Sequence, residues 1–430
     1  MSGGRLNSAA PGRYIAEALS NPRNALILLA LGLANAIRFS IATFARWNLD
    51  DFSLHYTEAL ALRNGLNPYV TDLTPLAREH GLVLGVLTRA AETPFFLVTF
   101  EPLTILSPYG AHTVWFVLSA VALFAAFASI LVEMPEPNWA IRASLVGLAL
   151  LYLPLSRDFM FSQSQSIVLF MFALTMFFLR RDREGAAGAI IGIAALLRGY
   201  PGLMLGYFAV ARRWRATGAA VATIAAGTLL TIALTGLAPT AGFIGHEASW
   251  VTQEAFSNQT LDISVTAFLA RVLHYWFSHP ATETILILAG VVEVVLLMIA
   301  IRATIQCASA GDPDFRCYSL WIATAILVSP VAWIHYMTLF ILPFMLLVNA
   351  LIAGRVSICS AWFASANWAG AAVAIWLYNV YRLGALPMWR IGTPLPVAVI
   401  AEGSFFALLA GYLAIYFFAF DRPGSSESSN

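Results

Sequence analysis

Residues 180–215 read RRDREGAAGAIIGIAALLRGYPGLMLGYFAVARRWR, and the membrane topology follows from them. The stretch begins and ends with clustered arginines, and its apolar residues are interrupted once, at Arg198-Gly199-Tyr200-Pro201. Arginine collects on the cytoplasmic side of membrane proteins, so both clusters are predicted to lie there. The chain must then cross the membrane an even number of times between them. This predicts two short helices, 186–197 and 200–211, that meet at Arg198 on the opposite side.

The rest of the chain has the composition of a membrane protein. Of its 430 residues, 60% are hydrophobic and only 11% are charged. Soluble domains have about 25% charged residues, so most of this chain is predicted to lie in lipid. Apolar runs near the length of a membrane-spanning helix occur at 25–46, 111–132, 139–155, 161–179, 216–236, 282–301, 318–335, 338–354, 359–379 and 397–419.

These runs and the two short helices predict an all-α, polytopic membrane protein with about 12 membrane segments. With both termini in the cytoplasm, residues 1–24 form a cytoplasmic segment that precedes an uncleaved anchor helix, 25–420 form a single transmembrane domain, and 421–430 form a cytoplasmic tail. The long loops 47–110 and 237–281 then lie on the non-cytoplasmic side, where we expect interfacial helices. All seven histidines fall on that side or at its membrane edge.

The charged residues exclude several classes of function. The net charge is +1, so the basic surface of a nucleic-acid-binding protein is missing. All 24 basic residues are arginine, which excludes chemistry that needs a lysine, such as a P-loop or a Schiff base. Cys307, Cys317 and Cys359 lack the spacing of metal ligands and are too few for a disulfide framework. The predicted cytoplasmic loops are too short for a nucleotide-binding domain, so the working face is expected to point away from nucleotide sugars.

The first long loop opens with a candidate catalytic helix. At 3.6 residues per turn, Asp51, His55 and Glu58 share one face, whereas Phe52 and Tyr56 share another. This pattern is typical of a helix that lies at the membrane interface. A carboxylate at such a boundary can act as a general base, and Asp51 is the candidate. The alternative is a solvated acidic helix start that stabilises the helix dipole, and the spacing leaves both open.

Arg198 is the candidate anion-binding residue, because a guanidinium can hold a phosphate through paired N–H donors. Ionisable groups at membrane depth usually face a cavity or a partner, but Arg198 could instead reach the lipid headgroups. His335 follows Ser329-Pro330 in a turn between two helices and could donate a hydrogen bond or a proton to a leaving group. The alternative for this turn is an aromatic-belt contact through Trp333.

Three other polar positions stay open on the residues alone. Gln165, in Ser162-Gln163-Ser164-Gln165, opens a helix, where capping and interhelical hydrogen bonds would explain it as well as a binding role. Glu293 and Arg38 both lie inside apolar runs. Either a relay or a buried pair would account for them.

In their order and spacing, these segments resemble glycosyltransferase family 87, a group of mannosyltransferases that use polyprenyl-phosphate mannose and have the GT-C architecture. The resemblance runs from about Asp50 to Tyr336. Its motifs are Asp51-Phe52 with Tyr56, Gly65 to Tyr69, Gln165, Gly188-Ala189, Arg198-Gly199-Tyr200-Pro201, Arg212-Arg213-Trp214-Arg215-Ala216, Asn258-Gln259, and Ser329-Pro330 with Trp333 and His335.

The chain also departs from the family's pattern. Ser164 and Ile167 replace a glycine and an asparagine around the glutamine, and Tyr336 replaces a second histidine. A tyrosine-proline-proline motif of the first outer loop is reduced to Thr93-Pro94-Phe95. Arg198 replaces a lysine, which keeps the positive charge, so donor binding is still expected.

The resemblance implies a membrane hexosyltransferase that moves a sugar, mannose by analogy, from a polyprenyl-phosphate donor to a glycolipid or glycan acceptor. It implies inverting transfer on the non-cytoplasmic face of a bacterial plasma membrane, with Asp51 as general base and no metal or other cofactor. The partners would be the bilayer, the donor lipid and the acceptor, and no nucleic acid. The donor phosphate would be bound by Arg198, His335 and Gln165, and the acceptor or donor pocket would contain His55, Tyr56, Glu58, Asn258, Gln259 and Trp333.

A secondary transporter is the main alternative function, because twelve segments, a broken helix pair and intramembrane charge also fit that class. A transporter of this kind would have similar halves and key residues near the midplane. The two halves show no convincing similarity, and the candidate residues gather at one face. A lipid-linked-sugar flippase or polymer ligase is a third alternative.

Overall fold

A computed structural model describes most of the chain, and within the described residues every regular element is a helix. The prediction of an all-α fold is therefore confirmed. The residues that the structure describes are 10–48, 51–85, 87–134, 138–245, 262–277, 280–309, 315–353, 356, 358–381 and 402–420.

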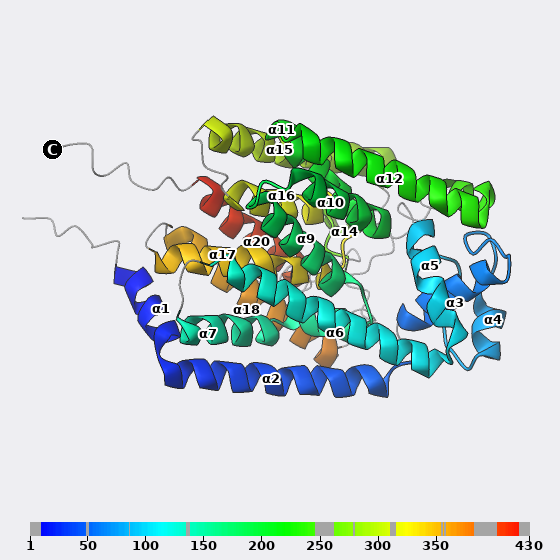
Figure 1. The fold of residues 1–430 in the computed structure, drawn as a ribbon, viewed down its shortest axis with the longest axis horizontal. Coiled ribbons are helices and arrows are strands. Elements are labelled where there is room, and N and C mark those ends of the chain that lie inside the picture. The colour runs from blue at the N-terminus through cyan, green and yellow to red at the C-terminus, as the bar shows by residue number, and fades with distance from the viewer. Residues whose placement is uncertain are drawn as a thin grey trace, which may run out of the picture.

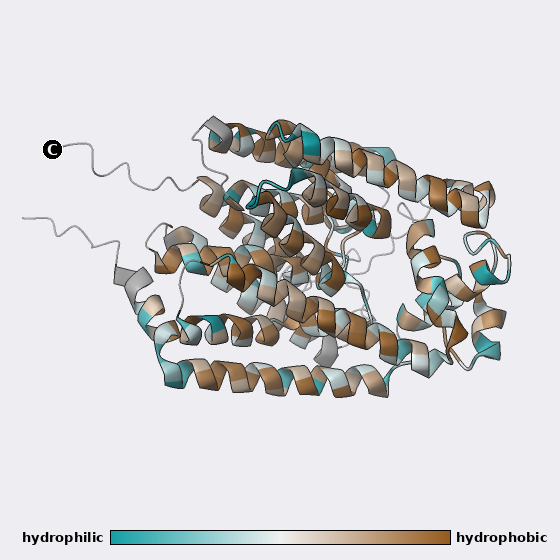
Figure 2. Cartoon of the chain, in the orientation of Figure 1, coloured by the Kyte–Doolittle hydropathy of each residue, from teal (hydrophilic) through white to brown (hydrophobic). Residues whose placement is uncertain are grey.

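Six helices in this part of the chain are long and apolar enough to cross a membrane, and a bent pair raises the count to seven. The chain is thus a multi-pass membrane protein. Figure 2 shows apolar residues along these helices, many of them exposed, as lipid-facing residues are. The six helices are α2 (Pro22–Ala45), α6 (Pro108–Val132), α12 (Trp214–Thr235), α15 (Thr282–Ser309), η3 (Ile334–Phe340) continuous with α17 (Ile341–Ile352), and α20 (Gly403–Phe420).

The other predicted runs contain shorter or less apolar helices. Run 161–179 contains α9 (Gln165–Leu179), and run 318–335 overlaps α16 (Phe315–Leu327), which ends well before its predicted boundary. Run 359–379 is a single helix, α18 (Ile358–Tyr381). Six of the twelve predicted membrane segments therefore correspond to single helices that are long and apolar enough to cross a membrane.

The run 139–155 is divided by a sharp bend. It forms α7 (Trp139–Leu151) and α8 (Leu153–Met160), whose axes differ by 57°. Pro154 lies in the first turn of α8 and has no N–H group with which to continue α7, so the helix breaks there. Because of this bend, the turn after α8 leads into the polar site described below.

The predicted break between two short helices is confirmed, whereas the crossing of the membrane by each of them stays a prediction. Residues 180–215 contain α10 (Glu184–Arg198), then η2 (Tyr200–Leu203) and α11 (Met204–Val210). The chain reverses at Gly199, whose φ of +38° favours glycine. The two arginine clusters lie close together. Arg213 of the second cluster forms an ion pair with Glu184, the residue that follows the first cluster, with Nη1 3.3 Å from Oε1.

Figure 1 shows the long helices lying side by side, with several short elements gathered at one end of the bundle, at the right of the view. We call this end the loop end. Helix α2 runs toward it and α6 leads away from it. The short elements are α3 (Asp51–Arg63), α4 (Thr74–Glu79), α5 (Pro94–Phe100) and η1 (Glu101–Ile105).

The predicted contact of the apolar face of α3 with the headgroup region is wrong. Every residue from Phe52 to Ala61 is buried, so protein surrounds the helix on all sides. Phe52 and Tyr56 pack into an apolar cluster with Phe96 and Phe100. The apolar face that was expected to lie in the headgroup region is therefore part of the protein core.

The cysteines also differ from expectation. Cys307 of α15 and Cys317 of α16 form a disulfide, whereas Cys359 is free and exposed. The bond joins two consecutive helices, and the sequence pattern gave no sign of this pairing.

Helices α10 and α12 pack so closely that Gly188→Ala is expected to destabilise the protein. A β-carbon at Gly188 would lie 2.0 Å from the carbonyl oxygen of Ala216, and overpacking of this kind costs about 1–3 kcal/mol. The midpoint of thermal unfolding in detergent should fall. Gly185→Ala is the matched control, because a β-carbon at Gly185 of the same helix meets no atom within 4 Å. Equal unfolding midpoints for the two variants would contradict this packing.

Candidate active site

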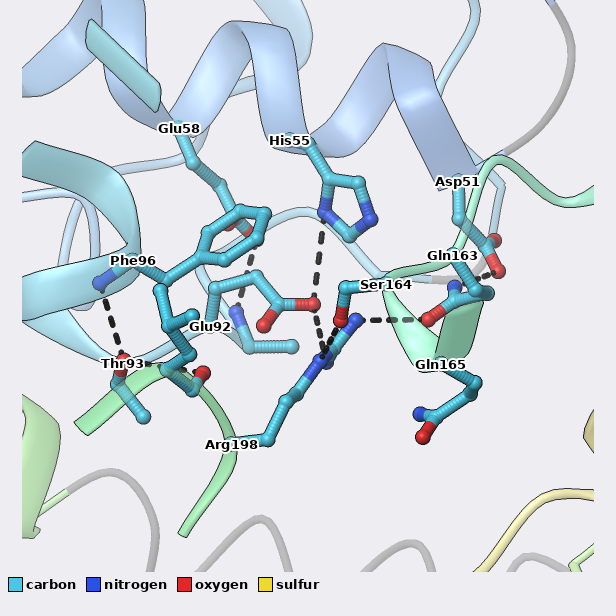
Figure 3. Close-up of polar contacts among 12 residues, drawn as sticks. Asp51, His55, Glu58, Glu92, Thr93, Phe96, Gln163, Ser164, Gln165 and Arg198 are labelled. Atoms are coloured by element: carbon cyan, nitrogen blue, oxygen red, sulfur yellow. Dashed lines mark hydrogen bonds and ion pairs between the residues drawn. The ribbon is translucent and has the colours of Figure 1, made fainter. Parts of the chain in front are cut away.

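A buried polar cluster at the loop end is centred on Arg198, the last residue of α10 (Figure 3). The Arg198 Nη1 donates to Glu92 Oε1 at 2.6 Å, and its Nη2 donates to Gln163 Oε1 at 2.8 Å. Its Nε donates to Ser164 Oγ at 2.6 Å. The ring of Phe96 lies beneath the guanidinium, 5.6 Å from Cζ. Only 11% of the Arg198 side chain is exposed, so protein groups hold this cation almost entirely.

Asp51 is joined to Arg198 through one amide. The Gln163 Nε2 donates to Asp51 Oδ2 at 2.7 Å, while the Gln163 oxygen accepts from Arg198. Burial raises the pKa of Asp51 above its ordinary value, although the Gln163 hydrogen bond and the Arg198 charge oppose that shift. A carboxylate with a raised pKa is a stronger base once it is ionised, and Asp51 is still partly exposed.

His55 is a neutral imidazole in this environment. Burial lowers the pKa of His55 well below its ordinary value, and the charges of Arg198 and His335 add to the effect. The His55 Nδ1 lies 3.5 Å from Glu92 Oε1. Among the described residues, neither ring nitrogen of His55 has a hydrogen-bond partner. The buried ring therefore has unused hydrogen-bonding capacity.

Glu58 and Glu92 are two buried carboxylates in the same cluster. The Glu58 Oε1 accepts from the backbone N of Ala91 at 2.8 Å, and its other oxygen has no partner in the described part of the chain. Burial raises the pKa of Glu58 well above its ordinary value, and the charge of Glu92 adds to this. Burial also raises the pKa of Glu92, against the opposing effect of Arg198.

Thr93 fixes the loop that carries Glu92. Its hydroxyl accepts from the backbone N of Phe96, which caps α5, and donates to the carbonyl of Leu196 at 2.6 Å near the end of α10. The hydroxyl of Tyr69 donates to the backbone carbonyl of Glu92 at 2.6 Å. Together these bonds place Glu92 beside Arg198.

Asp158 organises the turn that carries Gln163 and Ser164. Its carboxylate accepts from the backbone N–H groups of Gln165 and Ser166, at 3.0 and 2.9 Å, where α9 begins. On the other side of the turn, the indole N–H of Trp115 donates to the carbonyl of Ser162 at 2.7 Å. Ser162 itself has a φ of +53°, a conformation that L-residues rarely adopt. Both sides of the turn are therefore anchored.

The turn before His335 is held by Asp262, which is bound in turn by Arg271. Asp262 forms an isolated antiparallel bridge with Trp333, and its Oδ1 accepts from the backbone N of Ala332 at 3.1 Å. Arg271 donates to the carbonyl of Asp262 at 2.9 Å and to both carboxylate oxygens of Glu402, at 2.6 and 2.9 Å. We call this buried ion pair the Arg271–Glu402 clasp.

His335 lies close enough to Arg198 and His55 for their charges to interact. Its Nε2 is buried and has no hydrogen-bond partner among the described residues. The ring centroid of Tyr336 lies 5.2 Å from that of His335 and 5.0 Å from that of Tyr200. The turn thus places the His335 imidazole within electrostatic range of the Arg198 guanidinium.

The structure brings together most of the predicted site. Asp51, His55, Glu58, Arg198 and His335 lie in or beside one cluster. Gln165 accepts from the hydroxyl of Tyr200, and its amide nitrogen is buried without a described partner. Two predicted pocket residues are placed elsewhere: the Tyr56 hydroxyl donates to the carbonyl of Leu106 at 3.0 Å, outside the cluster, and the backbone of Trp333 pairs with Asp262. Asn258 and Gln259 lie outside the described residues.

Sequence reasoning missed Glu92, which is the ion-pair partner of Arg198. The available signal was its position directly before Thr93-Pro94-Phe95, the segment that the family resemblance had already singled out. Gln163 was passed over in favour of Gln165. In the described part of the chain, no three His, Cys, Asp or Glu side chains are placed to hold a metal ion.

The fold and the site define a multi-pass membrane protein in which a carboxylate and a guanidinium are linked at one end of the helix bundle. The sequence profile described as "Glycosyltransferase family 87" matches residues 92–330, more than half of the chain. The chain therefore belongs to glycosyltransferase family 87 and is a membrane glycosyltransferase. The matched range begins at Glu92 and includes Gln165 and Arg198, whereas Asp51 and His335 lie outside it. Family membership favours a glycosyltransferase over the transporter alternative.

Among solved structures, the chain is similar to ArnT from Cupriavidus metallidurans in the apo state. The two share 17% sequence identity over 89% of this chain and 77% of that chain, with a TM-score of 0.34. A TM-score this low does not establish a common fold. No curated protein matches the sequence.

Proposed function

We propose that this glycosyltransferase moves a hexose, mannose by analogy with the family, from a polyprenyl-phosphate-sugar donor to a glycolipid or glycan acceptor. The transfer inverts the anomeric carbon, and Asp51 is the general base. The observation that carries this proposal is the Asp51–Gln163–Arg198 connection, which holds a base and a phosphate-binding group at a fixed separation. An inverting transfer needs both groups in the same pocket.

In this mechanism Asp51 takes the proton of the acceptor hydroxyl as that oxygen attacks the anomeric carbon. The bond between the anomeric carbon and the phosphate oxygen breaks, and polyprenyl phosphate leaves with the bonding electrons. The transition state is oxocarbenium-like, as in glycoside hydrolysis. Arg198 and the nearby His335 stabilise the charge that develops on the leaving phosphate, and they are already in place before the reaction starts.

The position of the cluster supports a lipid-linked donor. Arg198 ends α10 and its guanidinium contacts Glu92, which precedes α5 of the loop end. A polyprenyl phosphate presents its charge at such a boundary between a helix bundle and its connecting loops. We place the loop end on the non-cytoplasmic side of a bacterial plasma membrane, with both termini in the cytoplasm. The GT-C architecture and the count of twelve membrane segments are also part of what we propose.

The donor class is tested with radiolabelled sugars in membranes that contain the protein. We expect label to pass to lipid or glycan from polyprenyl-phosphate mannose and not from a nucleotide-activated mannose. Membranes that contain the Asp51→Asn variant control for other transferases in the preparation. Asp51-dependent transfer from the nucleotide sugar alone would overturn the proposal. The anomeric configuration of the product, determined by NMR, tests inversion.

A further inference from the structure

Glu92 already binds the guanidinium of Arg198, the group that we propose binds the donor phosphate. Its Oε1 lies 2.6 Å from Arg198 Nη1, and both side chains are largely buried, with 5% and 11% exposed. A carboxylate and a phosphodiester are both anions that bind a guanidinium through charge-assisted hydrogen bonds. The two anions therefore compete for Arg198.

The charges around Glu92 strengthen this competition between the two anions. Its titratable and charged neighbours are Asp51, His55, Glu58, Arg198 and Tyr200. His55 is neutral, so a single guanidinium faces up to three carboxylates before any ligand binds. An incoming phosphodiester adds another negative charge to a pocket with little water to screen it.

We propose that Glu92 is an internal counter-ion, which holds Arg198 while the site is empty and gives up that place to the phosphate of the donor. This inference rests on the proposed function, since it takes a polyprenyl-phosphate donor as the ligand. It assigns Glu92 a role in donor affinity and not in the chemical step. Glu92 also keeps Arg198 compensated between turnovers, when an unpaired buried cation would be costly.

A proton accompanies this exchange. Once the phosphate takes Arg198, Glu92 loses its cation and gains an anionic neighbour, so the pKa of Glu92 rises further above the value that burial has already raised. Binding is then linked to uptake of one proton by Glu92. At pH values between the pKa values of the free and the bound state, the Kd for the phosphate should rise with pH, by up to tenfold per unit.

The test uses polyprenyl phosphate as its methyl ester, a sugar-free phosphodiester that, like the donor, carries no proton that titrates near neutral pH. Its binding to the purified protein is measured by its effect on thermal unfolding, with polyprenol of equal length as the uncharged comparison. In Glu92→Gln the amide oxygen can still accept from Arg198, but the negative charge is gone. We expect the methyl ester to bind this variant with a Kd about tenfold lower than for wild type, a change of about 1.4 kcal/mol. We also expect its Kd to vary little with pH.

Two further variants complete the design. Glu101→Gln is the matched control, because Glu101 lies in η1 of the same loop and has no ion pair in the described residues. Its Kd should equal that of wild type. Glu92→Asp keeps the charge, so it should keep the pH dependence even if its shorter side chain alters the affinity. Unfolding without ligand shows whether each variant is folded.

The outcomes separate this inference from the proposed function. If Glu92 only orients Arg198, Glu92→Gln will bind the methyl ester more weakly than wild type, and the inference is wrong while the donor class stands. The same holds if the pH dependence persists in Glu92→Gln and disappears in Glu58→Gln, since Glu58 would then take up the proton. If the methyl ester binds no folded protein better than polyprenol does, both the inference and the proposed donor fail.

Discussion

Asp51→Asn is expected to abolish glycosyl transfer while leaving the protein folded. Asparagine has the size of aspartate, and its amide oxygen can still accept the hydrogen bond from Gln163 that Asp51 accepts at 2.7 Å. It cannot take a proton from the acceptor. General base catalysis contributes about 10²–10⁴-fold, so the initial rate should fall by that factor. The rate of transfer and the midpoint of thermal unfolding are measured on the same preparation.

Asp72→Asn is the matched control for this variant. Asp72 lies in the same loop, is exposed, and accepts from the backbone N of Thr74 at 2.9 Å at the start of α4, a bond that asparagine can also accept. Its activity should be unchanged. Full activity in Asp51→Asn would remove Asp51 from the mechanism.

The pH profile gives a second readout for Asp51. The base must be ionised, so wild-type transfer should be present above the pKa of Asp51 and should be lost as the pH falls through it. Because burial raises that pKa, the loss should occur at a higher pH than an exposed aspartate would give. A rate that stays constant down to the ordinary range of aspartate would argue against Asp51 as the base.

Arg198→Gln should lose both transfer and stability. The loss of the cation removes the group that we propose stabilises the leaving phosphate, and electrostatic groups of this kind contribute about 10²–10³-fold to the rate. It also leaves Glu92, with 5% of its side chain exposed, without its partner. Breaking such a pair costs about 3–5 kcal/mol. Transfer assays and chemical unfolding measure the two effects separately.

A double variant separates the two roles of Arg198. Adding Glu92→Gln to Arg198→Gln removes the stranded charge, so stability should return while transfer stays lost. Arg198→Lys keeps the charge without the planar fork and should retain part of the activity. Arg215→Gln, at an exposed position in α12, is the control and should behave as wild type. An active and stable Arg198→Gln protein would contradict the central role of this residue.

Much of the membrane architecture could be predicted because it follows from local signals. Helices α2, α6 and α12 begin and end within three residues of the apolar runs 25–46, 111–132 and 216–236. The reversal near Arg198 followed from the parity of crossings between two arginine clusters. The bend between α7 and α8 was missed because run 139–155 is apolar throughout, and Pro154 alone was not treated as a break.

From the residues alone, the grouping of the site was predictable only where its residues share an element, and the grouping of Arg198 and His335 with them came from the family resemblance. The period of 3.6 placed Asp51, His55 and Glu58 on one face, and the structure puts all three in the cluster. The period does not indicate whether lipid or protein covers the opposite face of the helix. In the structure, protein covers it. Glu92 had no such signal, because its partner Arg198 is 106 residues away in the chain. Its role depends on tertiary contacts that no local pattern encodes.

The Arg271–Glu402 clasp sets the order in which this enzyme can be completed during its synthesis. Glu402 leaves the ribosome 131 residues after Arg271, and the helix that follows it, α20, is the last in the described chain. A nascent protein therefore carries Arg271 without its countercharge until that final helix arrives. The contacts of Asp262 with Ala332 and Trp333 join residues that all precede Glu402, so they can form earlier. The Arg271–Glu402 pair is therefore among the last of the described tertiary contacts that can form during synthesis.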